Sequence, residues 1–444
     1  MKSSTGPPIP DETRPRLLRV YRFATSLAHP LARPLLSWRT RHGKEDPAHR
    51  RERYGEASCP RPEGPLVWVH AASVGETMSV LPMIERILST GGVSVLMTTG
   101  TTTSTQIAKA RLGVARHEGR AIHQYVPLDG PRFVRRFLDH WKPGLAIFAE
   151  SELWPNLIIE AARSGARLSL VNARMSDRSF RRWQKGSSMI GELLSRFDLC
   201  LAQSEGDRER LQALGAKPVI CSGNLKYDVP APAADDAELS RFAGALGDRP
   251  RWMAASLHRG EDEPVLDAHQ AIAARYLGLL TIFAPRHPAR AAEIVAAIEA
   301  RGLTVAMRSR GEIPGAGTDI YLFDTIGEMG LAYRLAPIVF VGGSLAAIGG
   351  HNPIEPAKLA SAILHGPHIS NSTEIYAALH RAGGAVEVAD TEELAARVCQ
   401  FLSVPDDVAR HAAAANSAVT AFSGALDRSM DALDPLLAAI AGGR

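Results

Sequence analysis

Residues 342–358 combine a glycine-rich turn with polar side chains that could bind a nucleotide. The apolar run 338–341 directly before them predicts a strand, and the two glycines that follow let the backbone turn sharply at its end. Pro353 suits the first turn of a helix, and the N-terminus of a helix favours an anion. Asn352 and Glu355 belong to that turn, where a carboxylate could accept hydrogen bonds from ribose hydroxyls. A plain strand-to-helix loop, with Glu355 as a stabilising first-turn charge, explains the segment equally well.

The first half of the chain carries acidic residues at two predicted strand ends. Glu76 follows a small-residue loop and begins a helical pattern, so it could act as a general base, although a helix-dipole partner would occupy the same position. Glu150 and Glu152 follow the apolar run 145–148. Carboxylates in such a place are costly without partners, which favours a site. Lys226 is one candidate cation for them.

A second group of polar residues follows predicted strands in the second half of the chain. Arg286 and His287 end an apolar run directly before Pro288, where a helix is expected to begin. An arginine, a histidine and a helix N-terminus together could form a phosphate site, and the alternative is a solvated loop. Another loop could hold a nucleotide base and ribose, and its residues are Gly327, Glu328 and Met329.

Several common active-site motifs are absent from the sequence. It contains no GxxxxGK[ST] phosphate loop, no DxD, no HExxH, no GxSxG and no Cys/His cluster with zinc spacing. The four cysteines are scattered without CxxC spacing, which is typical of reduced thiols. We therefore expect neither a phosphate-binding loop of the NTPase type nor a metal cofactor.

Two sheets of buried parallel strands are expected to position these residues. From residue 65 onward, runs that are apolar throughout alternate with amphipathic helical patterns, which indicates two doubly wound α/β domains. Ligands in such sheets bind beyond the carboxyl ends of the strands, so we expect a central cleft faced by both domains. The expected strands are 66–71, 93–98, 145–148, 168–171, 252–255, 279–284, 304–307, 320–323, 338–341 and 362–364.

A proline-rich, acidic linker divides the chain, which at 444 residues is too long for one ordinary core. The expected segments are a basic amphipathic N-terminal segment at 1–55, a Rossmann-like domain at 56–226, the linker at 227–237, a second Rossmann-like domain at 238–425 and a C-terminal helix at 426–444.

The N-terminal segment is basic, although the whole chain carries a net charge of only +4. Residues 1–55 hold 12 Lys and Arg against 5 Asp and Glu, and residues 16–40 combine arginines with leucines and aromatic side chains. This composition fits a helix that lies in an anionic lipid interface, or an N-terminal helix packed on its own domain. Pro30, Pro34 and the arginines interrupt any apolar run of about 20 residues, so no membrane span and no secretory signal are expected. No aromatic-interleaved basic strand supports nucleic-acid binding.

The motifs, taken in order, resemble the 3-deoxy-D-manno-octulosonic acid (Kdo) transferases of lipopolysaccharide synthesis. The resemblance runs from about residue 17 to beyond residue 381. Its main motifs are residues 70–76 (HAASVGE), 150–156 (ESELWPN), 172–174 (NAR), 223–226 (GNLK), 285–288 (PRHP), 327–329 (GEM) and 342–356 (GGSLAAIGGHNPIEP). Two segments depart from the family pattern: residues 100–104 read GTTTS where the family has Thr-Pro-Thr-Gly, and residues 256–258 read SLH where it has Ser-Thr-His. Both departures could alter acceptor or donor contacts.

The resemblance implies a GT-B glycosyltransferase that uses CMP-Kdo as donor and a lipid A precursor of the lipid IVA type as acceptor. It implies a peripheral protein at the cytoplasmic face of the bacterial inner membrane, with the acceptor bound by residues 56–226 and the CMP-sugar by residues 238–425. By similarity Glu76 is the catalytic base, supported by Glu150 and Lys226. The residues that would bind CMP are Arg286, His287, Gly327, Glu328, Met329, Asn352, Pro353, Ile354 and Glu355.

Two alternatives stay open beside this interpretation. A transferase of the same family could have a changed acceptor, since residues 100–104 depart from the pattern. A catalytically silent module that binds a CMP-sugar or a membrane is the other possibility, although Glu76, Glu150 and Lys226 are all present.

Overall fold

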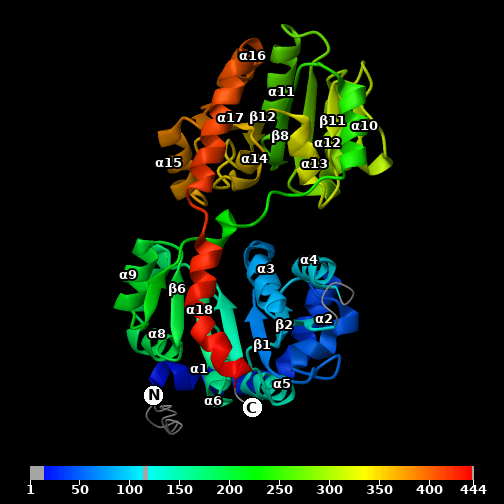
Figure 1. Cartoon of the computed structure of the whole chain (residues 1–444). Coiled ribbons are helices and arrows are strands. Elements are labelled where there is room, and N and C mark those ends of the chain that lie inside the picture. Colours follow the sequence, from blue (N-terminus) through cyan, green and yellow to red (C-terminus); the bar gives the residue numbers. More distant parts are fainter. Residues whose placement is uncertain (1–14, 114–118, 443–444) are drawn as a thin grey trace. The chain divides into compact units, whose positions relative to one another are not determined.

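The computed structural model describes residues 15–113 and 119–442. Residues 1–14 of the expected N-terminal segment and residues 443–444 of the expected C-terminal helix therefore lie outside the described residues. The chain forms two compact units (Figure 1). The first comprises Met1–Val229 and Ser423–Arg444, and the second comprises Pro230–Phe422.

The first unit is built on a seven-stranded sheet in the order β3-β2-β1-β4-β5-β6-β7. All neighbouring strands in it are parallel, and β1, β2 and β4 are buried along their whole length, which is why they read as continuous apolar runs. Because the strand order reverses beside β1, the topological switch point lies between β1 and β4. The strands are β1 Leu66–His70, β2 Ser94–Thr99, β3 Ala121–Tyr125, β4 Leu145–Ala149, β5 Arg167–Ala173, β6 Leu199–Ala202 and β7 Val219–Cys221.

Helices of the first unit cover this sheet, and the C-terminal helix is one of them (Figure 1). Asp228 accepts the backbone N–H groups of Gly424 and Leu426 at the start of that helix, and Leu433 is buried in the core of the unit. The helices are α1 Arg16–Leu27, η2 His29–Leu31, α2 Ala32–Arg41, η3 Pro47–Tyr54, α3 Val74–Ser89, α4 Thr102–Leu112, α5 Pro131–Trp141, α6 Pro155–Arg163, α7 Asp177–Gln184, α8 Ser187–Leu194, α9 Glu205–Ala213, η4 Leu225–Tyr227 and α18 Ala425–Ala441.

The second unit repeats the architecture with the strand order β10-β11-β9-β8-β12-β13-β14, again parallel throughout. Its switch point lies between β8 and β12. The strands are β8 Arg251–Leu257, β9 Leu280–Pro285, β10 Val305–Met307, β11 Ile320–Leu322, β12 Ile338–Val341, β13 Ala362–His365 and β14 Ala385–Glu387. The helices are α10 Asp236–Leu246, α11 Asp262–Ala273, η5 Pro288–Arg290, α12 Ala291–Ala300, η6 Arg308–Arg310, α13 Met329–Leu335, α14 Ile354–Lys358, α15 Thr373–Ala382, α16 Thr391–Ser403 and α17 Pro405–Thr420.

All ten strands predicted from the sequence are present, but the prediction missed four others. These four are β3, β6, β7 and β14, each of which lies at or near an edge of its sheet. Polar side chains interrupt the apolar pattern in β3 and β14. The strands β6 and β7 are apolar, and the prediction missed them although it found β10 and β11, which are equally short.

Candidate active site

Glu76 lies in the first turn of α3, directly beyond the carboxyl end of β1 and beside the switch point of the first unit. Ser73 is the N-cap, and its hydroxyl accepts the backbone N–H of Glu76. The Glu76 carboxylate in turn accepts the N–H of Ala72 at 2.7 Å and the hydroxyl of Ser73 at 2.9 Å. This reciprocal arrangement is a capping box, so Glu76 does serve the helix end. The same bonds hold its half-buried carboxylate in one orientation.

Two further carboxylates follow β4, the neighbour of β1 across the switch point. Glu150 forms an ion pair with Lys226, whose Nζ is 2.7 Å from the Glu150 Oε1 atom. Glu150 and Asn172 both have positive φ, near +50°, a conformation that L-residues rarely adopt and that clusters at functional sites. The Asn172 side chain accepts the N–H of Leu225 and thereby positions the segment that carries Lys226.

Glu152 contacts His70, the last residue of β1, with 3.4 Å between its Oε2 and the imidazole Nε2. Trp154 donates its indole N–H to the same carboxylate oxygen at 2.5 Å. Burial alone would raise the pKa of Glu152, but the contacts with His70 and Trp154 outweigh it and hold the pKa below its ordinary value. Glu152 is therefore a fixed negative charge close to Glu76.

The electrostatic environment of Glu76 suits a proton acceptor. Burial raises its pKa, the charge of Glu152 raises it further and that of Glu150 adds a smaller contribution. The hydrogen bonds from Ala72 and Ser73 oppose the rise without cancelling it. A carboxylate with a raised pKa is a stronger base than one in water.

In the second unit, the glycine-rich turn after β12 is filled by a carboxylate of the protein itself. Glu261 is fully buried and accepts the N–H groups of Gly343 at 2.7 Å and Ser344 at 2.9 Å. Its carboxylate also accepts the N–H groups of Leu345 and His258. Gly342 is required there, because a Cβ would lie 3.0 Å or less from two backbone oxygens and 3.0 Å from the Glu261 carboxylate. The turn thus satisfies part of its preference for an anion internally, which the sequence prediction had not foreseen.

Basic and histidine side chains gather at the carboxyl ends of β8, β9 and β12. The Nε2 atoms of His258 and His351 are 2.8 Å apart, and the ring of His287 meets that of His258 edge-on. Burial, and to a lesser extent the positive charges of His258, Arg286 and His287, lower the pKa of His351 to about 4. Arg286 and His287 are exposed. Such a concentration of positive charge in one place suits a phosphate, which would relieve the mutual repulsion.

The predicted nucleotide residues after this turn have distinct environments. Pro353 and Ile354 are buried, and the Asn352 side chain accepts the N–H of Ile354. The helix α14 has only five residues: it begins at Ile354, whose N–H is bound by Asn352, and ends at Lys358, two residues before Ala360, which has positive φ. Glu355 is accessible to solvent, has no hydrogen-bond or ion-pair partner among the described residues, and its partial desolvation raises its pKa.

The loop 327–329 lies directly before α13. Glu328 is bound by Arg308, whose guanidinium also pairs with Glu238 of α10. This ion pair holds the pKa of Glu328 below its ordinary value. Gly327 has a φ of +89°, and Met329 is partly exposed as the first residue of the helix.

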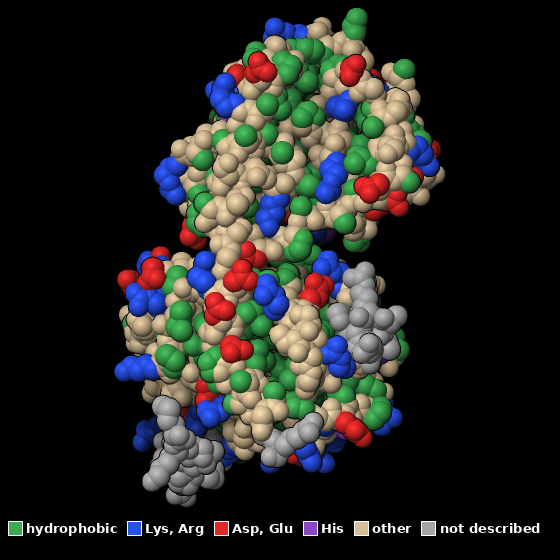
Figure 2. Space-filling view, in the orientation of Figure 1, with side chains coloured by type: hydrophobic (Ala, Val, Ile, Leu, Met, Phe, Trp, Pro, Cys, Tyr) green, Lys and Arg blue, Asp and Glu red, His purple; other side chains and the backbone are tan. Residues whose placement is uncertain are grey.

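The N-terminal helices α1 and α2 pack one face on the first unit and expose the other. Leu18 and Leu36 are buried, the hydroxyl of Tyr21 donates to Asp129, and Arg22 pairs with Glu160. Apolar side chains on the outer face are 45–66% exposed: Leu17, Val20, Phe23, Leu27, Leu31, Leu35 and Trp38. Lys and Arg side chains surround this end of the unit in Figure 2. Among the described residues, no helix has the length and apolar character needed to cross a bilayer.

Sequence reasoning missed three residues that the geometry brings into these places. Each of them contacts a partner far away in the chain: Glu261 contacts Gly343, 82 positions away, His351 contacts His258, 93 positions away, and His70 contacts Glu152, 82 positions away. Of these three residues, only Glu261 gave a local sign in the sequence, because it is an acidic residue that follows His258 at the end of β8.

The first unit has the strand order of dinucleotide-binding folds, and the second unit has the same order with β10 added at the edge beyond β11. Polar residues of both units gather at the switch points. A glycosyltransferase from Rickettsia africae has a similar structure, with a TM-score of 0.55 at 11% identity over 86% of this chain and all of that one. The fold class is therefore that of a two-domain, Rossmann-like GT-B protein, as predicted.

Residues 48–229 match the family model described as 3-Deoxy-D-manno-octulosonic-acid transferase (kdotransferase). The 3-deoxy-D-manno-octulosonic acid transferase of Haemophilus influenzae is 35% identical over 91% of this chain and 94% of its own length. A probable mitochondrial transferase of the same description from Arabidopsis thaliana is 34% identical over 92% and 93%. The chain belongs to the Kdo transferase family, a family of glycosyltransferases, which confirms the resemblance seen in its motifs.

Proposed function

We propose that the protein transfers Kdo from CMP-Kdo to a lipid A precursor of the lipid IVA type, with Glu76 as the general base. Family membership supports the class of reaction, and the environment of Glu76 is the observation that carries the proposed role of this residue. Its carboxylate is oriented by Ala72 and Ser73, and neighbouring Glu152 raises its affinity for a proton. In the reaction, Glu76 takes the proton of an acceptor hydroxyl, and the hydroxyl oxygen bonds to the anomeric carbon of Kdo as the bond to the CMP phosphate breaks.

Glu150 and Lys226 support this step through their charges. Lys226 neutralises Glu150 at 2.7 Å, which prevents a second uncompensated carboxylate from accumulating beside Glu76. A lysine in that position can also attract the acidic group of the donor sugar or an anionic acceptor. Preorganised charges of this kind often supply the largest share of catalysis.

The second unit binds the CMP part of the donor in this proposal. Arg286 and His287, with His258 beside them, meet the phosphate and stabilise it as it leaves with the bonding electrons. Glu355 has a free, accessible carboxylate and accepts the ribose hydroxyls. Gly327, Glu328, Met329, Asn352, Pro353 and Ile354 shape the remainder of the nucleotide site. Because side chains supply the positive charge, we propose that the transfer needs no metal ion.

The N-terminal helices hold the enzyme at the membrane that contains its acceptor. Their outer face combines exposed apolar side chains with Arg19 and Arg33, a composition that binds anionic lipid interfaces. We therefore propose peripheral association of residues 16–40 with the cytoplasmic face of the bacterial inner membrane.

Labelled CMP-Kdo tests the proposed reaction with the purified full-length chain. Label should move to a lipid A precursor and should not require any other protein. Transfer to a different lipid, with none to the precursor, would establish a changed acceptor. Binding of CMP without transfer to any acceptor would establish a silent binding module.

A further inference from the structure

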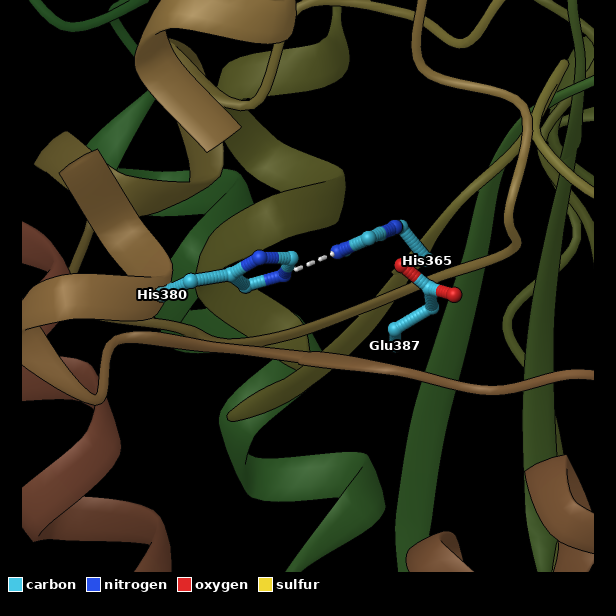
Figure 3. Close-up of side chains that lie close together, drawn as sticks. All are labelled: His365, His380 and Glu387. Carbon is cyan, nitrogen blue, oxygen red and sulfur yellow. Dashed lines mark hydrogen bonds between the residues drawn. The ribbon is translucent and has the colours of Figure 1, made fainter. Parts of the chain in front are cut away.

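Three metal-ligating side chains converge at the edge of the second unit's sheet, and none of them is among the residues assigned to the nucleotide. They are His365, His380 and Glu387, and Figure 3 shows their polar atoms turned toward one another. One ligand atom of each lies within 4.8 Å of the other two. In the part of the chain that the structure describes, no other group of three His, Cys, Asp or Glu side chains lies as close.

The imidazole of His365 is prepared as a ligand. Its Nδ1 is 2.7 Å from the carbonyl oxygen of Gly366. A carbonyl oxygen can only accept, so Nδ1 carries the proton and donates it, and the Nε2 of the neutral ring presents its lone pair to the cluster. A backbone carbonyl that fixes the tautomer of a histidine is the usual outer partner of a metal-bound imidazole.

Regular secondary structure holds the three residues. His365 ends β13, and Glu387 is its direct partner in the parallel register with β14, so their side chains leave the same face of the sheet. His380 lies in the last turn of α15. The C-terminal end of a helix carries partial negative charge and favours a cation.

We propose that His365, His380 and Glu387 bind a divalent cation of the zinc class. Two imidazoles and one carboxylate suit zinc, nickel, copper or cobalt better than magnesium or calcium. The two Nε2 atoms are 2.7 Å apart, and His380 donates to His365 (Figure 3). Zinc–nitrogen bonds of about 2.0–2.1 Å require roughly 3.3 Å between them. The exposed His380 and Glu387 side chains can rotate to provide this separation.

A cation bound there would join the edge strand β14 and the end of α15 to the buried strand β13. Its role is therefore to stabilise this part of the second unit, with water as the remaining ligand. The proposal is independent of the transfer reaction, which it neither supplies nor requires.

Zinc binding to the chelator-treated full-length protein tests the proposal. Calorimetry with zinc chloride and the visible spectrum after addition of cobalt chloride report the site. The informative variants are His380→Ala and Glu387→Gln, because both residues are exposed and their replacement leaves the core intact. His368→Ala and Glu374→Gln remove an exposed histidine and an exposed carboxylate of the same unit and serve as controls.

We expect the wild type and both controls to bind one zinc ion in this site and to unfold at a higher temperature when zinc is present. The variants His380→Ala and Glu387→Gln should each lose at least about 10-fold in affinity, together with the thermal shift. The proposal is wrong if the wild type binds no zinc, or if the two variants bind it as tightly as the controls.

Discussion

Replacing Glu76 by glutamine should remove most of the transfer activity while leaving the fold almost unchanged. Glutamine is nearly isosteric with glutamate and can occupy the same place in a capping box: its amide oxygen can accept the N–H of Ala72, while its amide NH2 faces the Ser73 hydroxyl, whose oxygen can accept from it. What disappears is the ability to take a proton. The change therefore separates the two roles that the structure combines in one carboxylate.

The magnitudes of the two effects differ enough to be told apart. A general base contributes about 10²–10⁴-fold to the rate, which corresponds to roughly 2.7–5.4 kcal/mol of transition-state stabilisation. The lost charge at the helix N-terminus costs about 0.3–1 kcal/mol of stability, partly offset by relief of repulsion from Glu152. By contrast, Glu76→Ala removes the side-chain acceptor of the Ala72 N–H and should cost more stability than Glu76→Gln, although Ser73 remains as the N-cap.

The assay measures kcat for Kdo transfer, CMP affinity and the thermal midpoint in parallel. Glu85→Gln, a glutamate on the same helix that pairs with Arg111, is the matched control and should retain full activity. In the wild type, kcat/KM should decline as pH falls through the raised pKa of Glu76, because the protonated carboxyl cannot act as a base. Glu152→Gln should move that decline to lower pH, since one source of the raised pKa is gone. Wild-type turnover by Glu76→Gln would refute the assignment.

Four other predictions follow from the same structure. Arg286→Ala and Glu355→Ala should each weaken CMP binding by about 1.5–3 kcal/mol, which is the contribution of a hydrogen bond to a charged group. If calorimetry finds unchanged CMP affinity in both variants, the nucleotide site lies elsewhere. Phe23→Asp should reduce retention on vesicles that contain anionic lipid, whereas Leu277→Asp, a change at an even more exposed apolar residue of the second unit, should not. Equal retention of the two variants would argue against the N-terminal helices as the membrane contact. Transfer should continue at an unchanged rate in EDTA, and loss of activity that Mg²⁺ restores would contradict a metal-free reaction. Burial lowers the pKa of His269 to about 4, so the folded state resists protonation of this side chain. The free energy of unfolding should therefore fall by roughly 3 kcal/mol, through this residue, as the pH drops from about 6.5 to 4. A His269→Gln variant whose stability has the same pH dependence as that of the wild type would disprove the contribution.

The sheets could be predicted from the sequence because their central strands are buried on both faces. Strands such as β1 and β4 have no polar side chains in their interiors, and each leaves an unmistakable apolar run. The edge strands β7 and β14 were not recognised by the same rule. Their place is determined by pairing with a neighbour, which depends on tertiary contacts.

The site could be predicted only as far as local motifs reach. Glu76 and Glu150 were found because each follows an apolar strand, whereas the raised pKa of Glu76 depends on Glu152, 76 positions further along the chain. The glycine-rich turn was recognised, but not that Glu261 fills it from another strand end. The outer face of the N-terminal helices left two alternatives, packing on the domain or contact with lipid. The structure confirms the packing through Leu18 and also leaves the apolar face exposed.

The most direct test of the central claim is a single-turnover measurement that quantifies free CMP and Kdo-bearing lipid in the same sample. The wild type, with CMP-Kdo and a lipid A precursor, should produce the two in equal amounts, and Glu76→Gln should slow both together. Release of CMP without a glycolipid product, or a glycolipid formed at the same rate by Glu76→Gln, would contradict transfer by base catalysis at this carboxylate.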